Sequence, residues 1–399
     1  MKITDVRCHL MQAGPPPHTG WTATGRSALA GSRNWLFVTV HTASGLVGTG
    51  EGSGWPRVVA AAIDDMRHLL VDEDAADIER LGQKLRVAMM GHGQTGVVGM
   101  GALAAIDSAL WDLKGLALDT PVVNLLGGFT RRRVPYYTHA ADVATARAAV
   151  ARGVRAVKVG GIDGVVERAH AIRAAIGPDV DMMVDLHGPP WLNAADAVAI
   201  GRALEPLNLL FLEEAVAPDN LDGWRRVRDQ VALPLAAGER LATLAEMRPF
   251  IDDRLLDVLQ PDSGRFGGIT QMRKLAGLAE AHGLMLAPHS GSLGPVAEFA
   301  AVHLMAAIPN ALILERMEPD WPGRAQTTGA ALIAADGHLH VPTGPGLGVQ
   351  INPDFVAAHP SQRNADLARG GWNPGTEDEA LYVQARRQRA RMTRTNQDQ

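Results

Sequence analysis

Seven polar or charged side chains recur at a nearly constant interval between residues 158 and 315, and this repeat constrains the fold of the chain most strongly. Each one ends a short apolar run, and they are Lys158, Asp185, Glu213, Glu239, Asp262, His289 and Glu315. Consecutive members are 27, 28, 26, 23, 27 and 26 residues apart. Helical patterns such as VVERAHAIRAAIG lie between the runs, so each interval fits one strand, one helix and two loops.

Strands that alternate with helices at this interval predict a parallel sheet with right-handed crossovers, and therefore an α/β fold. Seven or eight such units in about 200 residues predict a closed barrel. The C-terminal ends of barrel strands meet at one mouth, so residues far apart in the sequence become neighbours around a single cavity. The repeat therefore predicts an active site.

Composition limits the other possibilities. A barrel of about 200 residues leaves nearly half of the 399 residues for a second domain. The net charge of -5, with 46% hydrophobic and 20% charged residues, is typical of a globular protein and argues against nucleic-acid and membrane partners. Cys8 is the only cysteine, which excludes an internal disulfide and a zinc-thiolate cluster. The first residues lack the apolar core of a signal peptide, so we expect a cytoplasmic protein.

The residues before the barrel predict a smaller α+β domain. Alternating patterns at 2–12 and 35–51 indicate antiparallel strands, and three apolar stripes between 56 and 118 indicate helices. The intervening 13–34 stretch is rich in Gly, Pro, Ser and Thr, and it is either a solvated loop or a ligand-facing one. We place the domain boundaries at 1–128, 129–318 and 319–399, with the last segment packing back on the first domain and its Arg-rich end solvated.

Three carboxylates end successive predicted strands. Asp185, Glu213 and Glu239 would converge at the mouth, where they must bind a cation or repel one another strongly. Ligation by oxygen alone suits Mg²⁺, which prefers octahedral geometry and leaves positions for water or substrate. The alternative is that some of them are helix N-caps or ion-pair partners.

Two histidines are candidates for proton transfer. Asp262 and His289 end the next two strands, where the carboxylate can bond one ring nitrogen and leave the other facing the cavity. His187 lies two residues after Asp185, so an extended strand would direct it to the same face, as an acid on the opposite side of the metal. A core histidine is the alternative for each, and His139, near the end of the first barrel strand, is a cavity residue or a structural histidine.

The motifs around these residues resemble a known family. In order and spacing, VKVG, VDLHG, FLEE, AAGER, LQPDSGRFGG, APHS and LER resemble the mandelate racemase/muconate lactonizing enzyme branch of the enolase superfamily. The stretch AAIDSALWDLKGLALDTPVVNLLGG and the later PGLGV extend the likeness over almost the whole chain. The resemblance implies a modified TIM barrel, (β/α)7β, with an α+β capping domain formed by both ends of the chain, and a homo-oligomer between dimer and octamer.

Within this branch the chain is similar to acid-sugar dehydratases of the galactonate type. The similar features are the DxH pattern that includes His187, the stretch LPLAAGER, and GGWNP near the C-terminus. The resemblance implies Mg²⁺-dependent dehydration of a sugar acid to a 2-keto-3-deoxy acid, because such enzymes combine a Lys or His base with Mg²⁺ that stabilises an enediolate.

The resemblance also implies roles for further residues. Lys158 would bind the substrate carboxylate, and Glu315 would hydrogen-bond the enediolate as a protonated acid. The 13–34 loop and the helices would cap the mouth and select the substrate, with His18, Trp21 and Arg26 as candidate contacts.

One departure from the family pattern is informative. Racemases of the branch carry Lys-x-Lys on the second strand, whereas this chain has Lys158-Val159-Gly160. Glycine cannot move a proton, so racemisation by two bases is disfavoured and dehydration by one base is unaffected. An epimerase or a cycloisomerase is the alternative enzyme. A binding protein for sugar acids would not need an intact pair of Asp262 and His289.

Overall fold

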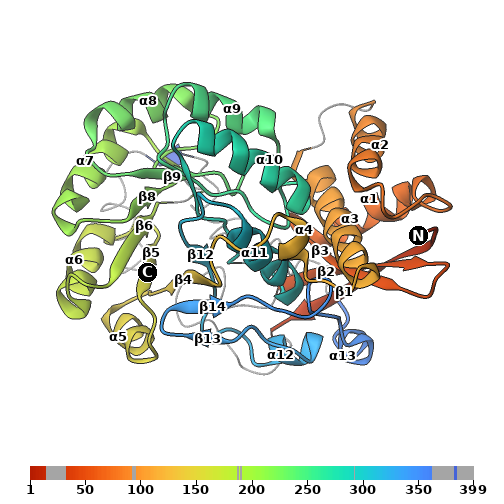
Figure 1. Ribbon diagram of the computed structural model, residues 1–399. Coiled ribbons are helices and arrows are strands. Elements are labelled where there is room, and N and C mark those ends of the chain that lie inside the picture. Colours follow the sequence, from red (N-terminus) through yellow and green to blue (C-terminus); the bar gives the residue numbers. More distant parts are fainter. Residues whose placement is uncertain are drawn as a thin grey trace, which may run out of the picture.

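The computed structural model describes residues 1–14, 33–91, 96–186, 188, 191–291, 293–361 and 382–383. Within these residues the chain forms an N-terminal α+β domain, a parallel barrel and a C-terminal segment that contacts both (Figure 1). Figure 1 shows the barrel on the left, the N-terminal domain on the right, and the blue C-terminal elements from β13 (Ala334–Ala335) to α13 (Pro353–Ala357) along the lower edge.

The N-terminal domain is an antiparallel sheet covered by helices. Its strands are β1 (Ile3–Ala13), β2 (Arg33–Thr42) and β3 (Val47–Gly52), in that order across the sheet. Its helices are α1 (Pro56–Met66), followed by a 3₁₀ turn (Arg67–Leu69), α2 (Ile78–Met90), α3 (Gly96–Ala117) and α4 (Val122–Leu125). Helix α3 lies directly on β3. The two elements approach so closely that a Cβ at Gly48 or Gly50 would collide with the carbonyl oxygens of Ala109 and Ala105. The predicted strands and helices of this domain are therefore present.

Helix α3 is the core helix of this domain. Among the described residues it is the one helix long and apolar enough to cross a membrane, but 78% of its most apolar window is buried inside the protein. It packs against β3 and against α10 (Gly268–Ala281) of the barrel. A buried position between two domains accounts for its apolar composition, and the cytoplasmic location stays a prediction.

The barrel alternates eight parallel strands with seven helices in the described part of the chain. Its strands are β4 (Arg133–His139), β5 (Ala156–Gly160), β6 (Asp181–Asp185), β8 (Phe211–Glu213), β9 (Leu235–Ala237), β10 (Val258–Leu259), β11 (Met285–Leu286) and β12 (Leu314–Glu315). Its helices are α5 (Val143–Ala151), α6 (Val165–Ile176), α7 (Ala194–Leu204), α8 (Leu221–Gln230), α9 (Leu244–Asp252), α10 (Gly268–Ala281) and α11 (Pro295–Ala307). Strand β12 pairs with β4, and a bridge between Leu286 and Ala311 joins the β11 side, so the sheet closes. This is the predicted (β/α)7β arrangement.

A layer of buried side chains fills the barrel below the mouth. One residue from or next to each strand contributes, and they are Tyr137, Ala156, Met183, Phe211, Ala236, Val258, Ala287 and Ile313. Successive side chains of a strand point to opposite faces, so the residue two positions later returns to the barrel interior, nearer the mouth.

The C-terminal segment consists of α12 (Gly323–Thr328), β13 (Ala334–Ala335), β14 (His338–His340), α13 (Pro353–Ala357) and β15 (Tyr382–Val383). Strand β14 pairs with β4 of the barrel, and a bridge between Met11 and Pro360 joins the segment to β1. Strand β15 instead pairs with the short strand β7 (Trp191–Leu192) beside the mouth. The boundaries at 128 and 318 stay predictions, and the Arg-rich end lies outside the described residues.

Candidate active site

The strand ends bring most of the predicted site residues together. Six mouth residues lie two positions after a residue of the buried layer, and they are His139, Lys158, Asp185, Glu213, His289 and Glu315. Asp262 lies four positions after Val258 and therefore also returns to the interior. Glu239 differs, because Gly238 has a φ of 142°, which turns the chain before the carboxylate.

Lys158 lies at the centre of a buried carboxylate cluster. Its Nζ is 2.7 Å from Glu315 Oε1, 3.1 Å from Asp185 Oδ2 and 3.1 Å from Glu213 Oε2. Burial opposes the charged form of Lys158, but Glu213 and the other carboxylates raise its pKa well above the usual value. Lys158 is therefore a buried cation that offsets part of the negative charge of the mouth.

Two of the predicted metal ligands, Glu213 and Glu239, have pKa values that are shifted in opposite directions. Burial, and then the nearby Asp185, raise the pKa of Glu213 to about 8. Burial also opposes the charge of Glu239, but Arg240 and His289 lower the pKa of this carboxyl well below its usual value. Two neighbouring buried carboxyl groups, Asp185 and Glu213, are better accommodated by a higher positive charge than Lys158 alone provides.

Asp262 and His289 form the predicted pair. Nδ1 of His289 is 2.6 Å from Asp262 Oδ2, and Nε2 is 2.8 Å from Glu239 Oε2. Burial opposes protonation of the ring, but Glu239, Glu315 and the bond to Asp262 raise its pKa well above the usual value. The contact between Nδ1 and Asp262 gives the pair the geometry of a base with an orienting carboxylate.

Glu315 is surrounded by hydrogen-bond donors. Oε2 accepts from the backbone N–H groups of Ser290 and Gly291, each at 2.8 Å, and Oε1 contacts His139 Nε2 at 2.6 Å as well as Lys158. Although burial opposes the charge, Lys158, His289 and His139 lower the pKa of Glu315 well below its usual value. These donors stabilise the carboxylate form, and the role of Glu315 as a protonated acid toward the enediolate stays a prediction.

Four predicted site residues lie outside the described part of the chain: His187, His18, Trp21 and Arg26. Their roles stay predictions. Arg33, near the end of the 13–34 stretch that contains the last three, is described and forms a buried ion pair with Asp320 at 2.8 Å.

Sequence reasoning missed two charged residues of the mouth, Glu214 and Arg240. Arg240 contacts both Glu214 and Glu239, donates to the Gly188 carbonyl at 3.0 Å, and lies over the Trp191 ring at 5.1 Å. Each directly follows a predicted ligand, Glu214 in FLEE and Arg240 in AAGER. The pair of adjacent charged residues in each motif was a signal that could have identified them. Alternation along a strand would place each of them on the opposite face from the ligand that it follows.

The donor set fits a divalent cation by its chemistry. Asp185, Glu213 and Glu239 end adjacent strands, are at most 8% exposed, and offer oxygen atoms only. In the described residues, however, no group of three His, Cys, Asp or Glu side chains has the close arrangement of a metal cluster. Asp185 and Glu213 instead share the Lys158 ammonium group, whereas Glu239 contacts Arg240 and His289.

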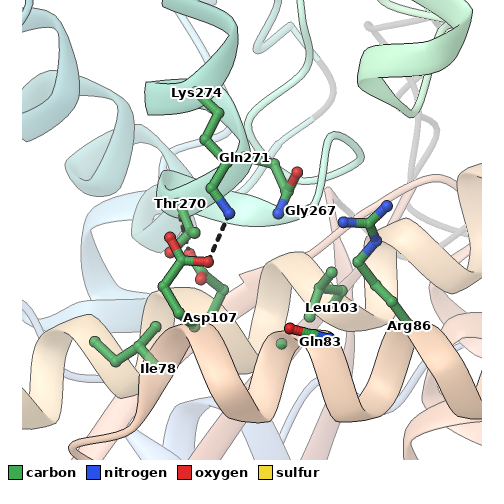
Figure 2. Close-up of a pocket in the computed structure, with 11 residues that line it drawn as sticks. Ile78, Gln83, Arg86, Leu103, Asp107, Gly267, Thr270, Gln271 and Lys274 are labelled. Atoms are coloured by element: carbon green, nitrogen blue, oxygen red, sulfur yellow. Dashed lines mark hydrogen bonds and ion pairs between the residues drawn. The ribbon is translucent and has the colours of Figure 1, made fainter.

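A separate cavity of about 100 Å³ lies between the two domains rather than at the mouth. Figure 2 shows that residues of α2, α3 and α10 line it, among them Arg86, Asp107, Gln271 and Lys274. None of the predicted site residues is part of its wall. The mouth, where the strand ends bring acids, a lysine and a histidine together, therefore stays the candidate active site.

Family comparison agrees with this geometry. Residues 18–127 match the N-terminal domain of the mandelate racemase/muconate lactonizing enzymes, and residues 141–355 match the enolase C-terminal-like domain. The chain belongs to the mandelate racemase/muconate lactonizing enzyme family. The family predicted from the sequence is therefore confirmed, and so is the prediction of an enzyme.

Relatives within the family are named dehydratases. The chain is 35% identical to a D-galactonate dehydratase of Ralstonia nicotianae, over 85% of this chain and 96% of the relative. It is 34% identical to a D-galactonate dehydratase of Klebsiella pneumoniae, over 85% and 94%. The predicted likeness to galactonate-type dehydratases is therefore confirmed.

Solved structures of the family agree with the fold. The 3,6-anhydro-D-galactonate cycloisomerase of Zobellia galactanivorans has a TM-score of 0.81 and 29% identity, over 91% of this chain and 100% of that one. An enolase of Pantoea ananatis with bound d-gluconate and Mg has a TM-score of 0.79 and 27% identity, over 90% and 95%.

Proposed function

We propose that this chain is a Mg²⁺-dependent dehydratase that converts a sugar acid into a 2-keto-3-deoxy acid. The observation that carries the proposal is the His289 ring, held by Asp262 at 2.6 Å and directed at the carboxylate set, where Nε2 is 2.8 Å from Glu239. A positioned base beside ligands for a divalent cation is what removal of a proton α to a carboxylate requires. The names of the relatives and the gluconate-bound neighbour support the substrate class.

The residues divide the reaction between them. Asp185, Glu213 and Glu239 would hold Mg²⁺, which supplies a Lewis acid for the charge that develops on the substrate carboxylate. His289 Nε2 removes the α-proton, while Asp262 accepts from Nδ1–H and fixes the tautomer and orientation of the ring. Lys158 offsets the charge of the substrate carboxylate. His187 is the proposed acid that protonates the departing 3-hydroxyl.

A cycloisomerase is the second candidate, because the Zobellia galactanivorans neighbour with a TM-score of 0.81 carries that name. It would use the same first step and differ in the fate of the intermediate. A dehydratase loses a water molecule, whereas a cycloisomerase gives a product of unchanged mass.

A substrate panel tests the proposal. The purified enzyme with Mg²⁺ should release an α-keto acid from at least one member of a panel that includes D-galactonate and D-gluconate. Release should stop after EDTA treatment and resume on addition of Mg²⁺. Glu213→Gln should lower both turnover and Mg²⁺ affinity measured by calorimetry, whereas Glu280→Gln, at an exposed position of α10, should change neither.

Two results would contradict the proposal. Turnover that survives thorough EDTA treatment would remove the metal. Conversion of 3,6-anhydro-D-galactonate without loss of water, combined with no keto acid from any open-chain sugar acid, would favour the cycloisomerase.

A further inference from the structure

His139 is a polar residue of the mouth to which the proposed reaction gives no role. It ends β4, two positions after Tyr137 of the buried layer, and it is paired in register with Lys158 on β5. Its side chain is 22% exposed, compared with 1% for Lys158 and 0% for Glu315. His139 therefore lies nearer the opening of the mouth than the two buried groups beside it.

The surroundings of Glu315 determine which ring nitrogen of His139 carries the proton. Lys158 and two backbone N–H groups already donate to this carboxylate, so the contact of 2.6 Å between His139 Nε2 and Glu315 Oε1 is a donation from Nε2–H. Nδ1 then carries the lone pair of a neutral ring. Burial lowers the pKa of His139, which favours this neutral form. No described residue forms a hydrogen bond with Nδ1.

The neighbouring strand β5 adds no further side chain on the face that carries Lys158. Two positions after Lys158 the chain has Gly160, which adds no side chain to the mouth. Beyond Lys158, the polar group that β4 and β5 present to the opening is therefore His139. A fixed acceptor on a partly exposed ring, with no hydrogen-bond partner among the described residues, suits a hydroxyl donor, and a sugar acid carries several hydroxyls.

We propose that His139 is a substrate-contacting residue whose Nδ1 accepts a hydrogen bond from one hydroxyl of the sugar acid, with Glu315 holding the ring in the required tautomer. The inference rests on the proposed function and extends it to substrate selection. A site built to bond a hydroxyl discriminates against the analogue that lacks it, because the acceptor, which bound substrate shields from water, is then left unpaired.

Two conservative variants separate the two ring nitrogens. His139→Gln keeps a donor near the position of Nε2, and so the contact with Glu315, but it removes the acceptor at Nδ1. His139→Asn keeps an acceptor near Nδ1 and loses the contact with Glu315. His170→Gln, at an exposed position of α6, is the matched control. Thermal melting of all three variants checks that the fold is retained.

The experiment compares kcat/KM for D-galactonate and D-gluconate with their 4-, 5- and 6-deoxy analogues. For the wild-type enzyme, one deoxy analogue should be poorer than its parent by about 10- to 100-fold, the value of one buried hydrogen bond. On the parent sugar acid, kcat/KM of His139→Gln should be lower than that of wild type by the same factor. On the deoxy analogue, the variant and wild type should have equal kcat/KM, because the substitution and the missing hydroxyl remove the same interaction. His139→Asn should retain part of the discrimination.

Different results separate the two proposals. Equal penalties in wild type and His139→Gln at all three positions, with the parent turned over by both, would overturn the role of His139 and leave the dehydratase intact. A wild-type enzyme that converts no sugar acid of the panel would overturn the proposed function, and this inference with it.

Discussion

His289 and His187 present different problems at the scale of single residues. His289 is fixed by Asp262 at Nδ1 and lies 2.8 Å from Glu239 through Nε2, so its orientation is determined by the fold. It explains removal of the α-proton, but hydroxide is a poor leaving group and needs a proton of its own. His187 is the predicted donor because it follows the predicted ligand Asp185 by two residues.

Replacing His187 should therefore separate the two steps. In His187→Asn we expect the α-proton to exchange with D₂O, because His289 is intact, while dehydration falls by the 10² to 10⁴ typical of a general acid. Exchange is measured by NMR and dehydration by release of α-keto acid. His289→Asn is the matched control, in which both exchange and dehydration should disappear. Dehydration by His187→Asn at the wild-type rate would show that another group protonates the hydroxyl.

The sequence located the strand-end residues because their chemistry repeats at the interval of one barrel unit. It could not assign the contacts between them. The ion pairs of Lys158 and the donors around Glu315 depend on side-chain rotamers in the closed barrel, and strand alternation alone excludes Arg240 and Glu214 from the mouth.

At the scale of elements, a buried ion pair joins the start of β2 to the stretch between β12 and α12. Arg33 and Asp320 are 2.8 Å apart, and each side chain is only 9% exposed. Arg324 also contacts Asp320, at 3.1 Å, and Glu298 on α11, at 3.2 Å. The network therefore connects the first residue of β2 to helix α11 of the barrel.

Removing the carboxylate from this network should destabilise the protein. In Asp320→Ala two arginine side chains lose a buried partner, and breaking a buried pair costs about 3 to 5 kcal/mol. Urea unfolding measures this free energy. Asp5→Ala is the matched control, because Asp5 and Arg7 form an exposed pair, at 38% and 58%, that is worth about 1 kcal/mol or less. Similar losses in the two variants would mean that the Arg33 pair contributes no more than a surface pair.

At the scale of the whole molecule, three buried carboxyl groups join the N-terminal domain to the rest of the chain. Glu51 accepts from the N–H groups of Gly294 and Ala297 on the barrel side, and Asp107 accepts from Thr270 at 3.0 Å. Asp112 accepts from Leu347 at 2.7 Å and from Thr49 at 2.8 Å. Burial raises the pKa of each of the three to about 7.

The Asp112 carboxyl should make stability depend on pH. Its pKa is 3.8 when exposed and about 7 in the folded protein, so folding favours the protonated form. The resulting stabilisation is complete below the exposed pKa and is lost as the pH rises through the pKa of the folded protein. Each unit of difference between the two pKa values corresponds to about 1.4 kcal/mol. Asp112→Asn, which cannot ionise, should therefore become more stable relative to wild type as the pH rises over this window.

Urea unfolding at several pH values tests this dependence. Asp65→Asn, at an exposed position of α1, is the matched control. A stability difference between wild type and Asp112→Asn that stays constant from acid to neutral pH would contradict the raised pKa.

The contacts between domains were the part of the fold that the sequence could not predict. Long periodic patterns predicted the barrel and the α+β domain, because periodicity persists over whole helices and strands. Asp107 and Asp112 carry no sign that distinguishes them from ordinary helix residues, and their partners are backbone groups far away in the chain. The pairing of β15 with β7 was equally inaccessible, since a two-residue strand has no period.

The alternation between the buried layer and the mouth determines which sequence changes this barrel can accept. Because Ala156 and Lys158 of β5, or Met183 and Asp185 of β6, share one face of their strand, a substitution at the second residue alters the chemistry and leaves the packing layer in place. A single inserted residue between them would instead turn the reactive group outward into the helix layer and bring a neighbour into the cavity. Divergence of such an enzyme toward a new reaction is therefore open to point substitution at strand ends and closed to insertions within strands.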